Sequence, residues 1–159
     1  MGSIKFSTNA KRLSTDIKKR VTDYQKNVSD AINDAGLNIE SDAKLRIQEH
    51  SSRKSFPNVR SEKAGNSKRV MQGIKKEDGT PQDPSATVSS NELPIGAYLE
   101  FGTGIYAREY LQDRPEEEKS KAREFYKTGK GTIRAFPYLF PSFDAERPKL
   151  IERLKRAKI

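Results

Sequence analysis

The chain has 159 residues, of which 33% are hydrophobic and 33% are charged, and its formal net charge is +9. This length favours a single domain spanning residues 1–159, and the low apolar content predicts a modest core. The sequence contains no cysteine and only one histidine, which excludes disulfides, thiolate metal sites and histidine metal clusters. The basic excess favours a polyanion or an acidic protein surface as partner.

No stretch of the sequence is long and apolar enough to cross a bilayer. Residues 1–6 also lack the apolar core of a signal peptide. We therefore expect a protein that is made in the cytoplasm and does not associate with membranes.

Residues 13–49 have helical periodicity. Apolar or small side chains recur at steps of three or four: Leu13, Ile17, Val21, Tyr24, Val28, Ile32, Ala35, Ile39, Ala43 and Ile47. This pattern predicts one amphipathic helix, with Gly36 as a point where it bends or loosens. The helix is too long for a small domain to cover evenly. Two interpretations stay open: part of its stripe meets another subunit, or the whole helix packs along one sheet.

Residues 51–66 are polar and basic, and we expect a long loop there that is mobile or functional. Lys68–Lys76 and Ala86–Ser89 alternate briefly, and the turn residues between them predict an antiparallel hairpin. Pro94 is expected to open a short helix or turn that leads into Tyr98.

The segment Ile95–Gly104 combines aromatic and aliphatic residues with one carboxylate and a glycine pair. Glu100 lies inside an apolar run, and a buried carboxylate needs partners. We therefore expect Glu100 to accept hydrogen bonds from backbone amides or to pair with an arginine. Phe101 is expected to fill the core, while Gly102 and Gly104 shape a turn.

Residues 105–133 form a polar insert in which Pro115–Lys127 predicts a helix, with acids at its start and bases toward its end. Arg134–Phe143 then holds four aromatics and two prolines, which predicts a rigid apolar strap. The strap is expected to be core or to anchor a neighbouring subunit. It leads into a C-terminal helix that ends in basic residues.

The sequence offers no convincing catalytic, cofactor or metal site. Gly102-Thr103-Gly104 lacks the remaining residues of a phosphate-binding loop, and Glu116–Glu118 is better explained as a helix start. A lone His50 at a helix end is more consistent with a structural role than with catalysis. An enzyme such as a nuclease is therefore the weakest functional class, and we expect none.

Two groups of basic residues are candidates for contact with DNA or with another subunit: Arg53, Lys54, Arg60 and Lys63 in the loop, and Arg153, Lys155 and Arg156 near the C-terminus. Such residues bind phosphates without reading base sequence. Solvated faces or salt bridges between subunits explain them more simply than a dedicated nucleic-acid site, and basic residues that face passing DNA inside a ring are a third option.

The order of elements resembles the neck or tail-completion proteins of long-tailed bacteriophages, the minor tail component family. The resemblance covers roughly residue 13 to the end and rests on nine residues: Tyr98, Glu100, Phe101, Gly102 and Thr103, then Phe136, Pro137, Leu139 and Pro141. Gly104 completes the structural motif that these residues form. The chain departs from the family at Lys63–Ser67, which lacks the usual Thr-Gly-x-Leu step, and in its long insert.

The resemblance implies a non-enzymatic virion protein of the neck or tail that is made in the host cytoplasm. Such proteins form rings that join the head connector to the tail and complete or terminate it. It implies self-association, with a hexamer expected for a six-fold tail, and contacts with connector or stopper and tail-tube proteins. Non-specific contact with passing DNA is also implied. The predicted fold is α+β, with a small, mainly antiparallel sheet packed by the N- and C-terminal helices; the alternative function is a small basic nucleic-acid-binding protein.

Overall fold

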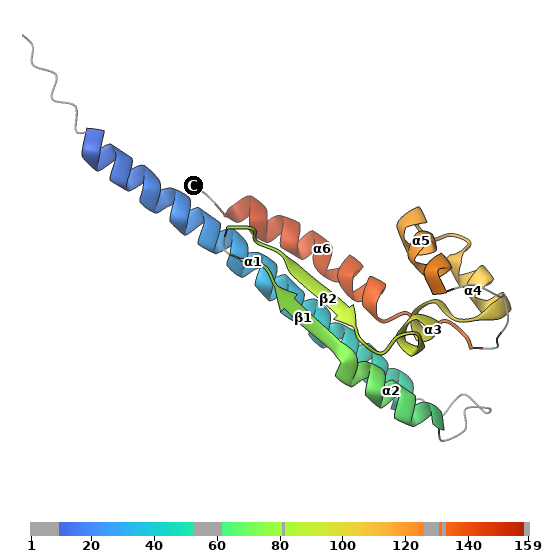
Figure 1. Ribbon diagram of the computed structural model, residues 1–159. Coiled ribbons are helices and arrows are strands. Elements are labelled where there is room, and N and C mark those ends of the chain that lie inside the picture. The colour runs from blue at the N-terminus through green and yellow to red at the C-terminus, as the bar shows by residue number, and fades with distance from the viewer. Residues whose placement is uncertain (1–9, 53–61, 81, 126–130, 132, 158–159) are drawn as a thin grey trace, which may run out of the picture.

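The computed structural model describes residues 10–52, 62–80, 82–125, 131 and 133–157. Its elements are α1 (Ala10–Ser52), α2 (Glu62–Gly73), β1 (Ile74–Asp78), β2 (Ala86–Ser90), α3 (Ile95–Phe101), α4 (Gly104–Leu111), α5 (Glu116–Phe125) and α6 (Leu139–Arg156). A long N-terminal helix and a C-terminal helix accompany a two-stranded antiparallel sheet (Figure 1). The predicted α+β class is therefore confirmed.

Helix α1 is the spine of the molecule, and its prediction from the apolar stripe is confirmed. Its 43 residues extend over about 65 Å at 1.5 Å per residue. The C-terminal half carries the hairpin, α2 and α6, while the N-terminal half projects beyond them (Figure 1). Helix α1 runs unbroken through Gly36. There a Cβ atom would lie 2.7 Å from the Lys76 side chain and 2.9 Å from that of Ala86, so the glycine gives the hairpin room to approach.

The hairpin was predicted correctly, but the chain before it was not. Strands β1 and β2 pair from Ile74 with Ser90 to Asp78 with Ala86. The predicted strand over Lys68–Lys76 begins only at Ile74, and the predicted loop over residues 51–66 overlaps the first turns of α2. Brief alternation was misleading because residues 67–73 belong to α2, where Ser67 and Val70 are buried about one helix turn apart and Gln72 is exposed.

The described residues bury two hydrophobic clusters. The larger lies between α1, α2, β1 and the start of α6, and it is formed by Ala43, Ile47, Val70, Ile74 and Tyr138. The smaller joins α3 to α5 through Ala97, Phe101 and Ala122, with Phe140 packed against it. The expected helix start at Glu116 is confirmed, since Glu116–Glu118 occupy the first turn of α5.

Only the first part of the predicted strap is non-helical. Residues 133–138 lie outside regular structure, but Leu139 already begins α6, so Pro141 and Phe143 are helical. Pro141 lies in the first turn, where an amide has no intrahelical partner and proline is tolerated. The prolines therefore mark a helix start rather than a continuous strap, and we keep the word strap for residues 133–138.

Candidate functional site

The segment singled out by its sequence lies at the end of α3 and in the turn to α4. Glu100 and Phe101 are buried, and Gly102 is the residue that ends the helix. Phe101 is in the smaller cluster as predicted, with its ring centroid 5.8 Å from that of Phe140. The glycine pair shapes the turn as predicted, because Gly102 and Gly104 both have positive φ angles, 77° and 59°. The Glu100 carboxylate and the turn at Gly102–Gly104 therefore both lie against the segment that precedes and begins α6.

Glu100 binds the beginning of α6. Its Oε2 accepts hydrogen bonds from the amides of Tyr138 and Leu139, each at 2.8 Å, and its Oε1 accepts one from Phe140 at 3.0 Å. These donors include amides of the first turn of α6, which no residue of that helix can satisfy. The carboxylate also complements the positive end of the helix dipole. The predicted hydrogen bonds to backbone amides are thus confirmed.

The environment of Glu100 acts on its pKa in two directions. Burial raises the pKa of Glu100, because a desolvated carboxylate is costly, and the nearby Glu118 charge adds to this effect. The three amide donors work in the opposite direction, because they stabilise the ionised form. The residue Glu100 is only 3% exposed. It is therefore a structural acceptor enclosed by protein.

Three further contacts join the same turn to the strap. The Thr103 amide donates to the Ile133 carbonyl, and the Ile133 amide donates to Thr103 Oγ1, both at 2.8 Å. The Phe136 amide donates to the Leu99 carbonyl at 2.6 Å. At Gly102 a Cβ atom would lie 2.7 Å from the Ala135 amide nitrogen, so a larger residue would push the strap away.

We call Glu100, Gly102 and Thr103, with the residues they hold in 133–140, the strap clamp. In the sequence, the Tyr98–Gly104 segment and the strap are two separate motifs. The structure brings them together, across a separation of 38 residues between Glu100 and Tyr138. Tyr98 takes part through its backbone, since its carbonyl accepts the Gly102 amide at 2.9 Å.

The strap itself packs onto α1. The rings of His50 and Phe136 lie 4.1 Å apart between centroids, which places the lone histidine against the strap. Tyr138 is 2% exposed in the larger cluster, and burial raises the pKa of its phenol to about 12. Leu139 packs against the same cluster, whereas Pro137 and Pro141 are partly buried. The clamp thus fixes α6 over the C-terminal half of α1.

The predicted basic contact residues fall in different places. Arg53, Lys54 and Arg60 lie outside the described residues, and Lys63 lies in α2. Arg153 and Lys155 in α6 form ion pairs with Glu146 and Glu152. Arg156 lies beside Arg153 at the end of α6, so the structure places together only the C-terminal group of these cations.

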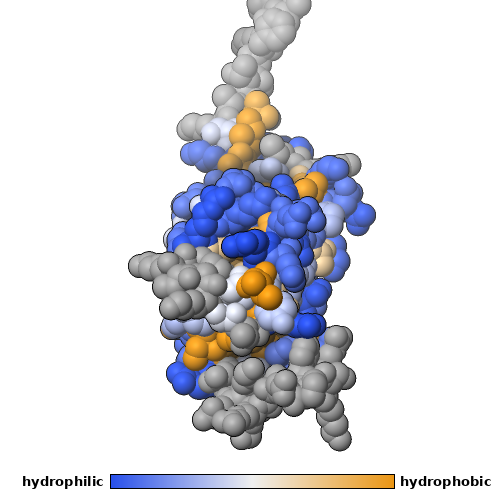
Figure 2. All heavy atoms as spheres, turned by 90° about the vertical axis from the view of Figure 1, so that its right-hand side faces the viewer, coloured by the Kyte–Doolittle hydropathy of each residue, from blue (hydrophilic) through white to orange (hydrophobic). Residues whose placement is uncertain are grey.

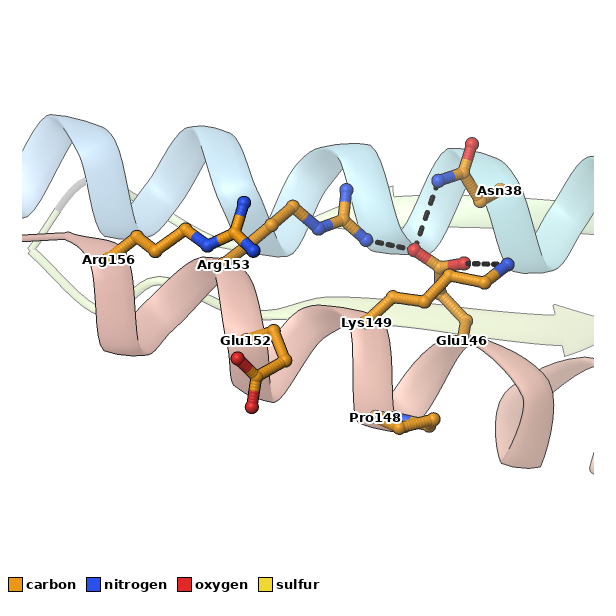
Figure 3. A pocket seen from close by; sticks show the side chains of 7 residues that line it. All are labelled: Asn38, Glu146, Pro148, Lys149, Glu152, Arg153 and Arg156. Atoms are coloured by element: carbon orange, nitrogen blue, oxygen red, sulfur yellow. Dashed lines mark hydrogen bonds and ion pairs between the residues drawn. The ribbon is translucent and has the colours of Figure 1, made fainter.

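A hollow of about 510 Å³ lies between α1 and α6, next to Arg153 and Arg156 (Figure 3). Glu146 lines this hollow, and its carboxylate binds Asn38 Nδ2 at 3.0 Å, Lys149 Nζ at 3.3 Å and the Arg153 guanidinium. Burial acts to raise the pKa of Glu146, but the bonds from Asn38 and Lys149 and the charge of Arg153 hold it below its usual value. Glu152 points away from this group (Figure 3). The hollow is therefore bordered by a cross-link between the two helices.

Sequence reasoning missed Glu146 and Asn38. The spacing of Glu146 with Lys149 and Arg153 was visible as a helical charge pattern, but such patterns usually mark a solvated face. Nothing in the sequence distinguished a buried carboxylate there from an exposed one. Glu118 was also missed. The sequence predicted an acidic helix start there, which is usually solvated, but the residue is only 4% exposed. Burial raises the pKa of Glu118, and Arg114 opposes this shift.

Among the described residues, no three histidine, cysteine, aspartate or glutamate side chains are grouped so that they could hold a metal ion. None of the helices in the described part of the chain has the length and apolarity needed to span a membrane. The chain matches no protein-family model, and no curated protein and no solved structure shows significant similarity to it.

Proposed function

We propose that the chain is a structural subunit of a phage neck or tail. It forms a ring at the top of the tail, joins the head connector to the tail, and completes or terminates the tail. The observation that carries this proposal is the strap clamp. The residues on which the resemblance rests make one structural unit, in which Glu100, Gly102 and Thr103 hold the strap and the start of α6.

The chemistry of the clamp supports an architectural role. The carboxylate oxygens of Glu100 are already engaged by three amides, and the hydroxyl of Thr103 accepts another. These groups are buried, so their hydrogen bonds position backbone rather than face a substrate. A subunit of this kind presents surfaces to its neighbours, and the basic excess suits acidic connector or tail surfaces, or a channel through which DNA passes.

The experiment is to compare virus particles made with and without this protein. Negative-stain images are scored for heads joined to tails and for tail length, with the wild-type chain supplied in trans as the control. We expect unjoined heads and tails, or tails of abnormal length, when the protein is missing. Normal joined particles in its absence would overturn the proposal.

The second candidate is a small basic nucleic-acid-binding protein, favoured by the net charge of +9. The ion pairs of Arg153 and Lys155 within α6 weaken this candidate, because paired cations are less able to bind phosphates. A filter-binding titration across salt concentrations separates the two candidates. Tight binding with a steep salt dependence supports nucleic-acid binding, whereas negligible binding at physiological salt removes it.

A further inference from the structure

Helix α5 is attached to the rest of the molecule by a small buried face. It lies beside α3 and α4, at the end of the molecule opposite the projecting half of α1 (Figure 1). Of its residues Glu116–Phe125, Glu118 and Ala122 are the buried ones, and they lie about one helix turn apart. Figure 2 looks onto this end of the molecule, where the surface is mostly hydrophilic. One of the two buried residues of α5 is therefore an acid.

Glu118 lacks the support that Glu100 receives. Both residues are at most 4% exposed, but three backbone amides donate to the carboxylate of Glu100. Glu118 Oε2 is buried and has no hydrogen-bond partner among the described residues. Its nearest cation there is Arg114, whose Nε lies 4.0 Å from Oε2, beyond the distance of a hydrogen bond. A buried carboxylate without donors is costly when it is ionised.

The other polar groups around Glu118 do not compensate its charge. The Arg114 guanidinium also lies over the Tyr110 ring, 4.6 Å from the centroid. The Tyr110 hydroxyl on α4 is itself buried without a hydrogen-bond partner in the described part of the chain, so it donates nothing to the carboxylate. The remaining charged neighbours are acids, Glu100 on α3 and Asp144 on α6. The site therefore favours a neutral Glu118.

The direction of the pH effect follows from these surroundings. Burial raises the pKa of Glu118 above its ordinary value of 4.5; the charge of Arg114 opposes this shift, and the charge of Asp144 adds to it. The folded chain therefore keeps a proton on Glu118 at pH values where an exposed glutamate has lost it. The stability that this proton gives is fully present below pH 4.5 and is lost as the pH rises through the higher native value.

We propose that a proton on Glu118 controls the docking of α5. With the proton in place, Glu118 is a neutral side chain that stays buried beside Ala122. Without it, the carboxylate moves into water and takes α5 with it, because the remaining apolar attachment of the helix, through Ala122 and the partly buried Phe125, is small. The release of α5 uncovers Ala97 and Phe101 on α3, so an apolar surface becomes accessible as the pH rises.

The strap clamp stays closed when α5 is released. The three amides that bind Glu100 belong to Tyr138, Leu139 and Phe140, and none of them is part of α5. Helix α6 therefore remains on the C-terminal half of α1, which serves as an internal reference in the test. The switch acts within a single chain and does not depend on the proposed ring.

Hydrogen exchange of the full-length chain, corrected for the pH dependence of the intrinsic exchange rate, tests the proposal. Between pH 5 and pH 8, we expect the protection of α5 to fall by about threefold or more, since each unit of pKa difference corresponds to about tenfold in the docking equilibrium. The C-terminal half of α1 should change much less. Equal protection of α5 at both pH values would overturn the proposal.

Two variants assign the effect to one carboxyl group. Glu118→Gln keeps the shape of the side chain but cannot ionise, so α5 should stay as protected at pH 8 as at pH 5. The matched control is Glu117→Gln, which changes an exposed acid in the same helix turn and should behave like the wild type. If Glu118→Gln loses protection with rising pH as the wild type does, another group is responsible and the proposal is wrong.

A direct titration keeps the proposal testable even if Glu118→Gln does not fold. The carboxyl carbon of Glu118 in the wild-type chain is followed by nuclear magnetic resonance from pH 3 to pH 9. We expect a titration midpoint above 4.5, with the amide signals of α5 changing over the same pH range. A midpoint at or below 4.5 would contradict the proposal, and so would α5 signals that do not follow the titration of Glu118.

Discussion

The two halves of α1 carry the same apolar repeat in different surroundings. Ala35, Ala43 and Ile47 in the C-terminal half are at most 3% exposed, whereas Leu13, Ile17 and Val21 in the N-terminal half are at least 42% exposed. The halves do not differ in period; they differ in whether α2, the hairpin and α6 reach them (Figure 1). The comparison shows that an amphipathic pattern marks an apolar face of a helix, but not how much of that face its own chain covers.

The largest expected effect comes from truncating a buried side chain in the covered half of α1. Ile47 is 1% exposed and packs in the cluster with Val70, Ile74 and Tyr138. Replacing it in Ile47→Ala should lower the free energy of unfolding by about 2–5 kcal/mol, because transfer energy is lost and a cavity is left. Urea denaturation monitored by circular dichroism measures this change.

The matched control is Ile17→Ala, the same substitution in the projecting half of α1. At a protein concentration where the chain is monomeric, it should change the free energy of unfolding by no more than about 0.5 kcal/mol, as is usual at exposed positions. Equal losses of unfolding free energy from Ile47→Ala and Ile17→Ala would show that the two halves of α1 are equally buried in the monomer. The contrast between the two halves would then be wrong.

The structure also shows which features could be predicted from the sequence. The steps between Leu13 and Ile47 were sufficient to place α1, because apolar residues that keep helical spacing over many turns fit no strand or loop. The short alternation around Val70 was not sufficient, since it fits a strand and a helix turn equally well. The acceptor role of Glu100 was predictable from its apolar neighbours. Its donors were not, because these amides of residues 138–140 are supplied by a segment whose position only the tertiary fold decides.

An intermediate effect is expected from releasing α6 at its first turn. Glu100→Ala leaves three amides without their acceptor in a buried site, so we expect a loss of about 1–3 kcal/mol in the free energy of unfolding. Because α6 covers α1, this change should also increase hydrogen exchange in the C-terminal half of α1 more than in the projecting half.

The control for this substitution is Glu109→Ala, which removes an exposed carboxylate from α4. It should leave the melting temperature nearly unchanged. An equally unchanged melting temperature for Glu100→Ala would show that the clamp does not stabilise α6.

The smallest expected effect concerns the cross-link between α6 and the covered half of α1, where Glu146 binds Asn38. The pKa of Glu146 is held below its ordinary value of 4.5, so the carboxylate stabilises the fold above that pH, and this contribution is lost as the pH falls through the lower native value. Pairs with partly exposed partners such as Lys149 and Arg153 contribute only about 0.2–1 kcal/mol. Urea midpoints measured from pH 7 to pH 3 should therefore fall slightly less for Glu146→Gln than for the wild type. If both chains lose stability in parallel down to the lowest pH, the charge of Glu146 does not hold α6 on α1, and apolar packing holds the two helices together instead.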